Sequence, residues 1–324
     1  MAQKITTNGW HDNAAVDGSS VLPRFTHEYL RFDSKLQPKK YEIQVGKVPN
    51  VNRISKESDV RVIDGRGRTL MSGLGDAHAH LTWNDNALEL LGTVGVEEHT
   101  LITAKSALTY LDSGYTMCYG AASAKDRLDC VIRDAINRGD LPGPRYLANG
   151  REMAKRDNEL SAGITAYADG PLEMREVIRH HAAIGVDQIK LSMSGESICE
   201  ARSAEECFFS DEETAACVDE AHRLGLRVCS HARARDSVIQ CVRHGVDVIY
   251  HASYTDEEGM KMLEEARHKH VVAPAINWLY TTVHEAEPFG YTFDTAERVG
   301  YKKELEVAIQ TLKEMHRRRI PILP

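Results

Sequence analysis

The sequence has no apolar run long enough to cross a membrane. Across its 324 residues, no stretch of about 18 or more apolar residues occurs. The first thirty residues also lack the apolar core of a secretory signal and the Arg-rich amphipathic character of a transit peptide. These absences predict a cytoplasmic protein with no membrane partner. The length of the chain is sufficient to bury a substantial hydrophobic core.

Cysteine pairs of the CxxC type are missing as well. Seven cysteines are present, an odd number, and no two of them are spaced as thiolate zinc ligands usually are. This pattern indicates neither a disulfide framework nor a cysteine-based zinc site. It is typical of a protein from a reducing compartment.

Basic residues are not concentrated in the sequence. The 40 Lys and Arg residues are outnumbered by 48 Asp and Glu residues, which gives a net charge of −8. The one basic cluster, Arg317 to Arg319, is interpreted as a solvated helix end. This balance argues against a nucleic-acid-binding protein. A small-molecule substrate is the expected partner, and a homo-oligomer remains an open alternative.

Short apolar runs alternate with helical segments from Thr69 onward, which is typical of parallel βα units. Residues 1–60 are polar and weakly periodic, with short strands expected at 41–45 and 59–63. The clearest unit begins with a capping box at Ser210, in which Glu213 reaches back. A helix follows, then Gly225 and the strand LRVCSH. Such units suit a doubly wound sheet and a closed barrel equally well.

The local motif that best suggests chemistry is Asp76-Ala77-His78-Ala79-His80, which directly follows the run TLMSGLG. Residues two apart in a strand point to the same side, so His78 and His80 would present two imidazoles to one point. That geometry suits a divalent ion such as zinc. The alternative is an incidental pair of surface histidines.

A second pair of histidines ends two successive strands. His231 ends LRVCSH and His251 ends VDVIYH, twenty residues later. This separation accommodates one short helix and two tight connections, so both should lie at the carboxyl ends of neighbouring parallel strands. Barrel enzymes carry their chemistry on that rim. Alternatively, each histidine is satisfied by a local hydrogen bond at the edge of the core.

Lys190 lies inside the predicted strand VDQIKLSMSG. A lysine buried in a parallel strand is costly unless it is paired or neutralised. A neutral amine there could take up carbon dioxide as a carbamate and so become a carboxylate able to bridge two metal ions. The alternative is a lysine near the strand end whose amine reaches solvent.

These residues follow one another at strand ends in the order His-x-His, Lys, His, His. In this order the chain resembles the amidohydrolase superfamily, specifically its imidazolonepropionase-like and prolidase-like branch, which includes enzymes that cleave dipeptides and N-acyl amino acids and is similar to ochratoxin-hydrolysing amidases. The resemblance covers roughly residues 60–275. The stretches that carry it are VIDGRGRTLMSGLGDAHAHL, LDSGYTMCYG, GPRYLANG, ADGPLEMREVIRHHAAIGVDQIKLSMSG and FSDEETAACVDEAHRLGLRVCSHARARDSVIQCVRHGVDVIYHASYTDEE.

The resemblance implies an α/β fold, a (β/α)₈ TIM-like barrel over residues 65–324 with a small β-rich, sandwich-type domain over residues 1–64. It also implies one or two divalent metal ions, with Zn²⁺ expected. The implied metal ligands are His78, His80, Lys190, His231 and His251. Lys190 would be carboxylated and would bridge both ions, and Lys190, His231 and His251 would be the catalytic residues. Bound metal would supply hydroxide at neutral pH and polarise the scissile carbonyl.

Three features depart from the family pattern. The resemblance implies an aspartate at the end of the eighth strand, but RRRIPILP reads as the start of that strand and the sequence ends at Pro324. We therefore expect a barrel that is incomplete at strand 8, either a truncated part of a longer enzyme, which we favour, or a short product with impaired activity. Residues 1–60 match poorly, and YHASY lacks the glutamate that often precedes the histidine.

Three functions remain open. The first is hydrolysis of a C–N bond at two metal ions, in an N-acyl amino acid, a dipeptide or a related carboxyamide. The second is a cyclic amidohydrolase or deaminase with one metal ion and an unmodified Lys190. The third is a catalytically impaired fragment that persists as a binding protein.

The sequence assigns no substrate-binding residue. The loops after barrel strands set specificity, and REMAKRDNELSAG and INWLYTTVHEAEPFGYTFD show the least pattern. Trp278, Tyr280 and Phe289 could line an apolar pocket or pack within a loop. Arg151 or Arg156 could meet a substrate carboxylate.

Overall fold

The computed structural model describes residues 66–69, 71–83, 88–158, 163–195 and 204–323, together with the backbone of three N-terminal strands. These strands pair antiparallel in the order β1 (Gln3–Thr6), β2 (Arg24–Tyr29) and β3 (Lys39–Gln44). The strand expected at 41–45 overlaps β3. The strand expected at 59–63 and the domain boundary at residue 64 lie outside the described residues, so the two-domain division stays a prediction.

The remaining strands form two sheets in which every pair is parallel. The first sheet has the order β4 (Leu74–Ala79), β5 (Tyr115–Gly120) and β6 (Arg145–Leu147). The second sheet has the order β12 (Val271–Ala273), β11 (Val248–His251), β10 (Arg227–Ala232), β9 (Gln188–Ser192), β7 (Glu152–Ala154) and β8 (Thr165–Tyr167). All-parallel pairing confirms the predicted α/β class.

Two backbone bridges connect the strands in the order of a barrel. Asn149, just after β6, bridges Gln188 at the start of β9 in parallel, which joins the two sheets. Ile322 bridges Val272 of β12, also in parallel. The order is therefore β4, β5, β6, β9, β10, β11, β12 and then residues 321–323. Whether the barrel is incomplete at its eighth strand stays a prediction.

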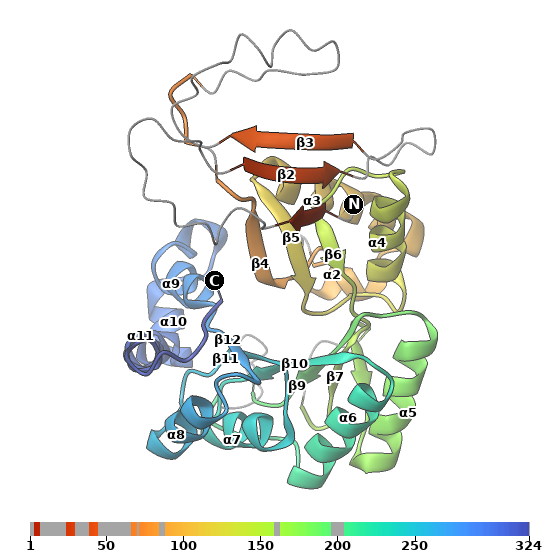
Figure 1. The fold of residues 1–324 in the computed structure, drawn as a ribbon. Helices are drawn as coiled ribbons and strands as arrows, with labels where there is room; N and C mark the ends of the chain where they lie inside the picture. Colours follow the sequence, from red (N-terminus) through yellow and green to blue (C-terminus); the bar gives the residue numbers. More distant parts are fainter. Residues whose placement is uncertain are drawn as a thin grey trace, which may run out of the picture.

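Helices connect most of these strands, and Figure 1 shows α5 to α8 on one side of the larger sheet. No helix in the described ranges is both long and apolar enough to cross a membrane. The helices are α2 (Leu88–Thr93), α3 (Val96–Asp112), α4 (Leu128–Arg138), α5 (Gly170–Ala183), α6 (Asp211–Arg223), α7 (Arg235–His244), α8 (Glu257–Glu265), α9 (Ile276–His284), the 3₁₀ helix η2 (Glu287–Phe289), α10 (Phe293–Val299) and α11 (Tyr301–Arg317).

The predicted start and end of α6 are confirmed. The Ser210 hydroxyl accepts a hydrogen bond from the Glu213 amide at 3.2 Å, and the Glu213 carboxylate accepts one from the Ser210 amide at 2.8 Å. Gly225 follows the helix with φ +76°, a left-handed conformation that glycine adopts without a steric penalty. This tight turn leads directly into β10, which ends in a candidate histidine.

The segment from Ile276 to Asp294 was interpreted as a patternless loop, and that interpretation is wrong. It contains α9, η2 and the start of α10. Leu279 and Val283 of α9 pack against Leu305 of α11 in a separate apolar cluster. The helices are short and pack on one another, so the helical period is difficult to detect in the sequence.

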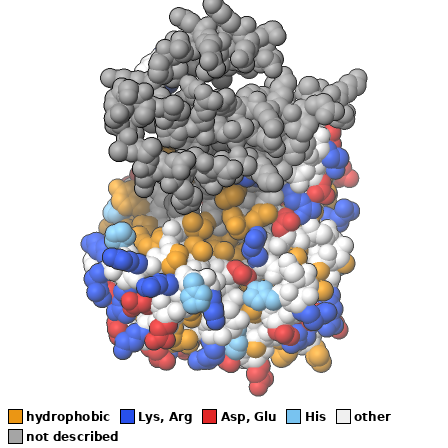
Figure 2. Space-filling model, viewed as in Figure 1, with side chains coloured by type: hydrophobic (Ala, Val, Ile, Leu, Met, Phe, Trp, Pro, Cys, Tyr) orange, Lys and Arg blue, Asp and Glu red, His pale blue; other side chains and the backbone are white. Residues whose placement is uncertain are grey.

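Apolar side chains from the larger sheet and its helices form the main core, which includes Ile189, Leu191 and Val228, all completely buried. On the face shown in Figure 2, basic and acidic side chains are interspersed over the lower part of the molecule. Hydrophobic side chains gather along the border with the residues that are not described. The core thus packs against the same strands whose ends carry the candidate histidines.

Candidate active site

Five residues singled out in the sequence come together at the carboxyl ends of four parallel strands. His78 is the last residue but one of β4, Lys190 is in β9, and His231 and His251 lie at the ends of β10 and β11. His80 directly follows β4. Since βα barrels carry their chemistry on this rim, the arrangement matches the expected position of an active site.

The four imidazoles form one cluster. The ring centroid of His78 lies 5.2 Å from that of His80 and 5.2 Å from that of His251. His251 in turn lies 4.6 Å from His231. The pair at the end of β4 therefore meets the pair at the ends of β10 and β11, although His251 lies one residue beyond the position that pairs with His231.

His251 joins this cluster because the strand alternation breaks at this residue: in the register of β10 and β11, His231 pairs with Tyr250, and His251 pairs with Ala232. His251 and Ala252 have φ values of +67° and +53°, a left-handed conformation that is costly for residues with a Cβ atom. The Tyr250 ring stacks on His78 at 3.8 Å, while the His251 ring also approaches His78. Two consecutive residues thus face one site, which regular pleating would prevent.

Lys190 is buried, with 2% of its surface exposed, so the alternative in which its amine reaches solvent is wrong. Its Nζ lies 3.5 Å from Nε2 of His78, 3.4 Å from Oε1 of Glu152 and 4.7 Å from the centre of the Tyr250 ring. Glu152 in β7 is itself buried. The carboxylate therefore compensates the buried ammonium, which would otherwise be costly.

Burial holds all four histidines in the neutral form. It lowers the pKa of His80 to about 3, and the Lys190 charge adds to the effect. It lowers the pKa of His78 and of His251 well below the usual value, with Lys190 as a further cause in each case. Burial also lowers the pKa of His231 well below its usual value, and the Arg233 charge is the next largest cause. At neutral pH each ring therefore keeps one unprotonated nitrogen.

The donor set suits a divalent ion. Nδ1 of His80 and Nδ1 of His251 are buried and have no hydrogen-bond partner among the described residues, which is unusual for buried ring nitrogens. Neutral imidazole is a common metal ligand. Within the same described ranges, however, no three His, Cys, Asp or Glu side chains converge in the geometry of a metal site. The chemistry of the side chains thus fits a metal, and Lys190 contacts the His78 ring of the cluster.

A buried ion pair supports the ends of β10 and β11. Arg233, two residues after His231, donates hydrogen bonds to both carboxylate oxygens of Glu304 in α11, the Nε bond at 2.8 Å. The Ser253 hydroxyl, two residues after His251, donates to the same carboxylate at 2.7 Å. Both charged groups are almost completely buried. Helix α11 thus links the two strand ends that carry the histidines.

The three aromatic residues considered as a possible pocket lining do not lie together. Trp278 approaches His251 at 5.8 Å between ring centroids and lies beside the Arg233 guanidinium. Tyr280 contacts His284 instead, and Phe289 is 89% exposed. Of the three aromatic candidates, Trp278 is therefore the one that borders the histidine cluster.

Sequence reasoning did not single out Glu152, Tyr250 or Glu304. Glu152 follows Gly150 in the stretch after GPRYLANG, where a charged residue in a short strand could have drawn attention. Tyr250 directly precedes His251, but alternation placed it on the other face. Glu304 is in an ordinary amphipathic helix, so nothing in the sequence indicated its burial.

The geometry agrees with comparisons to known proteins. Residues 69–288 match the amidohydrolase family. The chain belongs to the amidohydrolase family. Members of this family generally depend on metal ions, and their common architecture is the TIM-barrel-like α/β fold seen here. The resemblance read from the sequence is confirmed.

Among curated relatives, ochratoxinase from Aspergillus niger is 25% identical over 224 residues, which cover 60% of this chain and 46% of the relative. An uncharacterized protein from Mycobacterium tuberculosis is 27% identical over 199 residues, 61% of this chain and 49% of that protein. The chain spans about half the length of the curated relatives it matches.

Solved structures show the same fold. A prolidase complexed with N-methylphosphonate-L-proline superposes with a TM-score of 0.74 at 20% identity, covering 93% of this chain and 72% of the other. The A. niger ochratoxinase structure gives a TM-score of 0.68 at 20% identity, covering 78% of this chain and 62% of the other.

Proposed function

We propose that this chain forms the core of a metal-dependent hydrolase that cleaves the C–N bond of an amide in a small substrate. The observation that carries the proposal is the cluster of four neutral imidazoles around buried Lys190 at one end of the parallel strands. Family membership supports the reaction class. The names of the relatives, ochratoxinase and prolidase, support an N-acyl amino acid or a dipeptide as substrate.

Each part of the cluster has a proposed role. His78 and His80 would hold one divalent ion, Zn²⁺ being the expected metal, and His231 and His251 would hold a second. Bound metal would polarise the scissile carbonyl and make a water acidic enough to lose its proton near neutral pH. The residues of the chain would keep the four ring nitrogens unprotonated, orient them by stacking and burial, and exclude bulk water from Lys190.

Lys190 is proposed to act as a carbamate. The ammonium would first lose a proton, and the neutral amine would then add carbon dioxide and lose a second proton. These steps would replace a buried cation with an anion that could help to hold two metal ions. That change also places an anion near the Glu152 carboxylate, 3.4 Å from Nζ. Two buried anions at such a distance require nearby positive charge, which two divalent ions would supply.

One observation favours a second candidate, a mononuclear cyclic amidohydrolase or deaminase. The contact between Lys190 and Glu152 is the pairing expected of an unmodified ammonium. The two candidates differ in the state of Lys190. After incubation with ¹³C-bicarbonate and zinc, a ¹³C NMR carbamate signal that is absent in Lys190→Met supports the binuclear form, and its absence in both proteins supports the mononuclear one.

Hydrolysis itself is tested with a panel of N-acyl amino acids and dipeptides, by measuring amine release from protein loaded with zinc or manganese. We expect turnover that is lost on chelation, restored by added metal and abolished in His251→Asn. Absence of turnover from protein that carries its full complement of metal would contradict the proposed activity. Retained turnover in His251→Asn would contradict the proposed site.

A further inference from the structure

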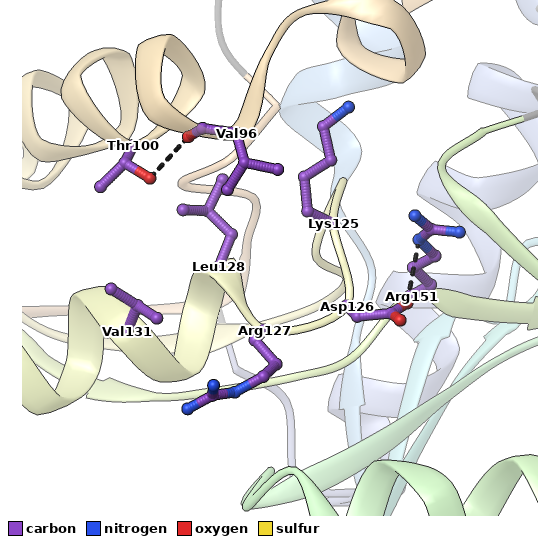
Figure 3. A pocket seen from close by; sticks show the side chains of 8 residues that line it. All are labelled: Val96, Thr100, Lys125, Asp126, Arg127, Leu128, Val131 and Arg151. Carbon is purple, nitrogen blue, oxygen red and sulfur yellow. Dashed lines mark hydrogen bonds and ion pairs between the residues drawn. The ribbon is translucent and has the colours of Figure 1, made fainter.

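A pocket of about 290 Å³ opens between the first turns of α3 and α4 and the loops that follow β5 and β6 (Figure 3). Its polar side is formed by Lys125, Asp126 and Arg127, which precede α4, and by Arg151, which follows β6. None of these residues belongs to the histidine cluster. The pocket is therefore a separate feature on the same rim of the barrel.

The charge of the pocket is positive in an acidic protein. Three cationic side chains line it against one carboxylate, whereas the whole chain has a net charge of −8. Arg151 contacts Asp126, with 3.2 Å between Nε and Oδ1. In the described part of the chain, Lys125 and Arg127 have no carboxylate within ion-pair distance. Positive charge thus remains available to an anionic ligand.

Lys125 is held in place rather than left free in solvent. Its Nζ donates a hydrogen bond to the carbonyl oxygen of Gly92 at 2.9 Å, and only 9% of the residue is exposed. Burial lowers the pKa of Lys125, and the Arg151 charge lowers it further. An anion bound beside both side chains would offset this repulsion, since opposite charge favours the protonated amine.

The opposite side of the pocket is apolar. Val96 begins α3, Leu128 begins α4, and Val131 lies one turn further along α4. Figure 3 shows these side chains on one side of the pocket and Lys125 and Arg151 on the other. A ligand that fits both sides carries an anionic group next to an apolar group, as an amino acid with an aliphatic or aromatic side chain does.

The loop that carries Lys125 also contacts the histidine cluster. The backbone of Ala122 hydrogen-bonds to His80, and the Ala124 amide donates to the Thr82 hydroxyl at 2.8 Å. Lys125 is three residues after Ala122, so their backbones are at most about 11 Å apart. An extended dipeptide, with its terminal groups, covers a distance of this order. A molecule of this length would therefore match the backbone separation between the residue that contacts His80 and the residue that lines the pocket.

The structure also distinguishes between the two arginines that the sequence analysis considered as contacts for a substrate carboxylate. Arg156 is engaged by Asp169 at 2.8 Å and by Glu173 at 2.6 Å, on the exposed side of α5. Its charge is therefore already compensated twice. Arg151, which faces the pocket beside Lys125, is the better candidate.

We propose that this pocket binds the free carboxylate of the substrate, with Lys125 and Arg151 as its cationic contacts and Arg127 at its edge. The inference rests on the proposed amide hydrolysis and assigns the residues that recognise the free carboxylate of its substrate. The side chain next to that carboxylate packs against Val96 and Leu128.

The test compares N-acetyl-L-leucine with N-acetyl-L-leucinamide, which differ in the carboxylate alone. Titration calorimetry measures binding of both to the full chain, and acetate release measures turnover. We expect Arg151→Met and Lys125→Met to weaken binding and raise KM of the carboxylate about 10-fold or more, with little change in kcat. The carboxamide should bind weakly to all proteins. Lys313→Met, an exposed lysine of α11, is the matched control.

Because Lys125 is buried, Lys125→Met could lower stability, so exposed Arg127→Met is the second variant and thermal melting is recorded for each. Equal effects on both ligands, or no effect of any pocket variant, would overturn the proposal. Inorganic phosphate serves as a free anion: binding that does not compete with N-acetyl-L-leucine would identify a separate anion site and also overturn it. If binding follows the prediction but no amide is hydrolysed, the proposed function fails and the pocket assignment stands.

Discussion

Tyr250 and His78 stack face to face, with ring centroids 3.8 Å apart and ring planes within 4° of each other. Tyr250 is completely buried, so its ring is held in place and keeps the His78 imidazole in one orientation. Tyr250 faces the site because it pairs in register with His231, and the left-handed backbone at His251 turns that residue toward the site as well.

Tyr250→Phe and Tyr250→Ala should therefore differ sharply in metal affinity. The phenyl ring keeps the stack, so Phe should retain affinity within a few-fold, whereas Ala should lose about 10- to 100-fold, as is common when a ligand's support is removed. Competition with a zinc-binding dye measures both. Equal affinities for the two variants would show that stacking does not orient His78.

The Arg233–Glu304 pair should be essential for stability. Glu304→Ala leaves a buried guanidinium without its carboxylate, and losses of about 3–5 kcal/mol are typical of such changes. The free energy of unfolding from urea titration measures the effect. Glu306→Ala, an exposed position on the same helix, is the control and should change stability by less than about 0.5 kcal/mol. A similar small loss for Glu304→Ala would contradict this assignment.

Asp129 predicts a specific dependence of stability on pH. Burial raises its pKa to about 7, although hydrogen bonds from Tyr146 and the Asn149 amide partly oppose the shift. The Tyr146 hydroxyl donates to its Oδ2 at 2.6 Å. The folded protein therefore binds a proton that the unfolded chain releases near pH 4. This contribution to stability is complete below that pH and is lost as the pH rises toward 7.

Asp129→Asn should remove that dependence. The neutral amide imitates the protonated carboxyl, so the variant should gain stability relative to the parent as the pH rises from 4 to 7, at up to about 1.4 kcal/mol per pH unit. Urea midpoints at several pH values measure the difference. Asp112→Asn, at the exposed end of α3, should show a constant offset. A constant offset for Asp129→Asn as well would mean that its proton is not bound preferentially in the folded state.

The repeating units were predictable because their signals are local. The capping box at Ser210 and the glycine at 225 bound one helix, and the strands that follow end in histidines at equivalent positions. Parallel pairing then places the ends of both strands side by side, although His251 faces the cluster only because its backbone is left-handed. The two-residue spacing of His78 and His80 is also a local signal, and it was sufficient to predict that the two side chains point to the same side of the strand.

Other parts of the site depend on tertiary contacts that local patterns do not contain. Tyr250 and His251 both face the cluster because the backbone at His251 is left-handed, which strand alternation does not anticipate. The burial of Glu304 depends on how α11 packs on strand ends more than fifty residues earlier in the chain. The choice of Arg151 over Arg156 required the positions of Asp169 and Glu173.

The central claim is that His78, His80, Lys190, His231 and His251 hold divalent metal, and the zinc content of the purified chain tests it most directly. Elemental analysis after zinc loading and desalting should give about two ions per wild-type chain and about one in the His231→Asn/His251→Asn double variant. Less than one ion in the wild type, or a content unchanged by the double substitution, would contradict the account.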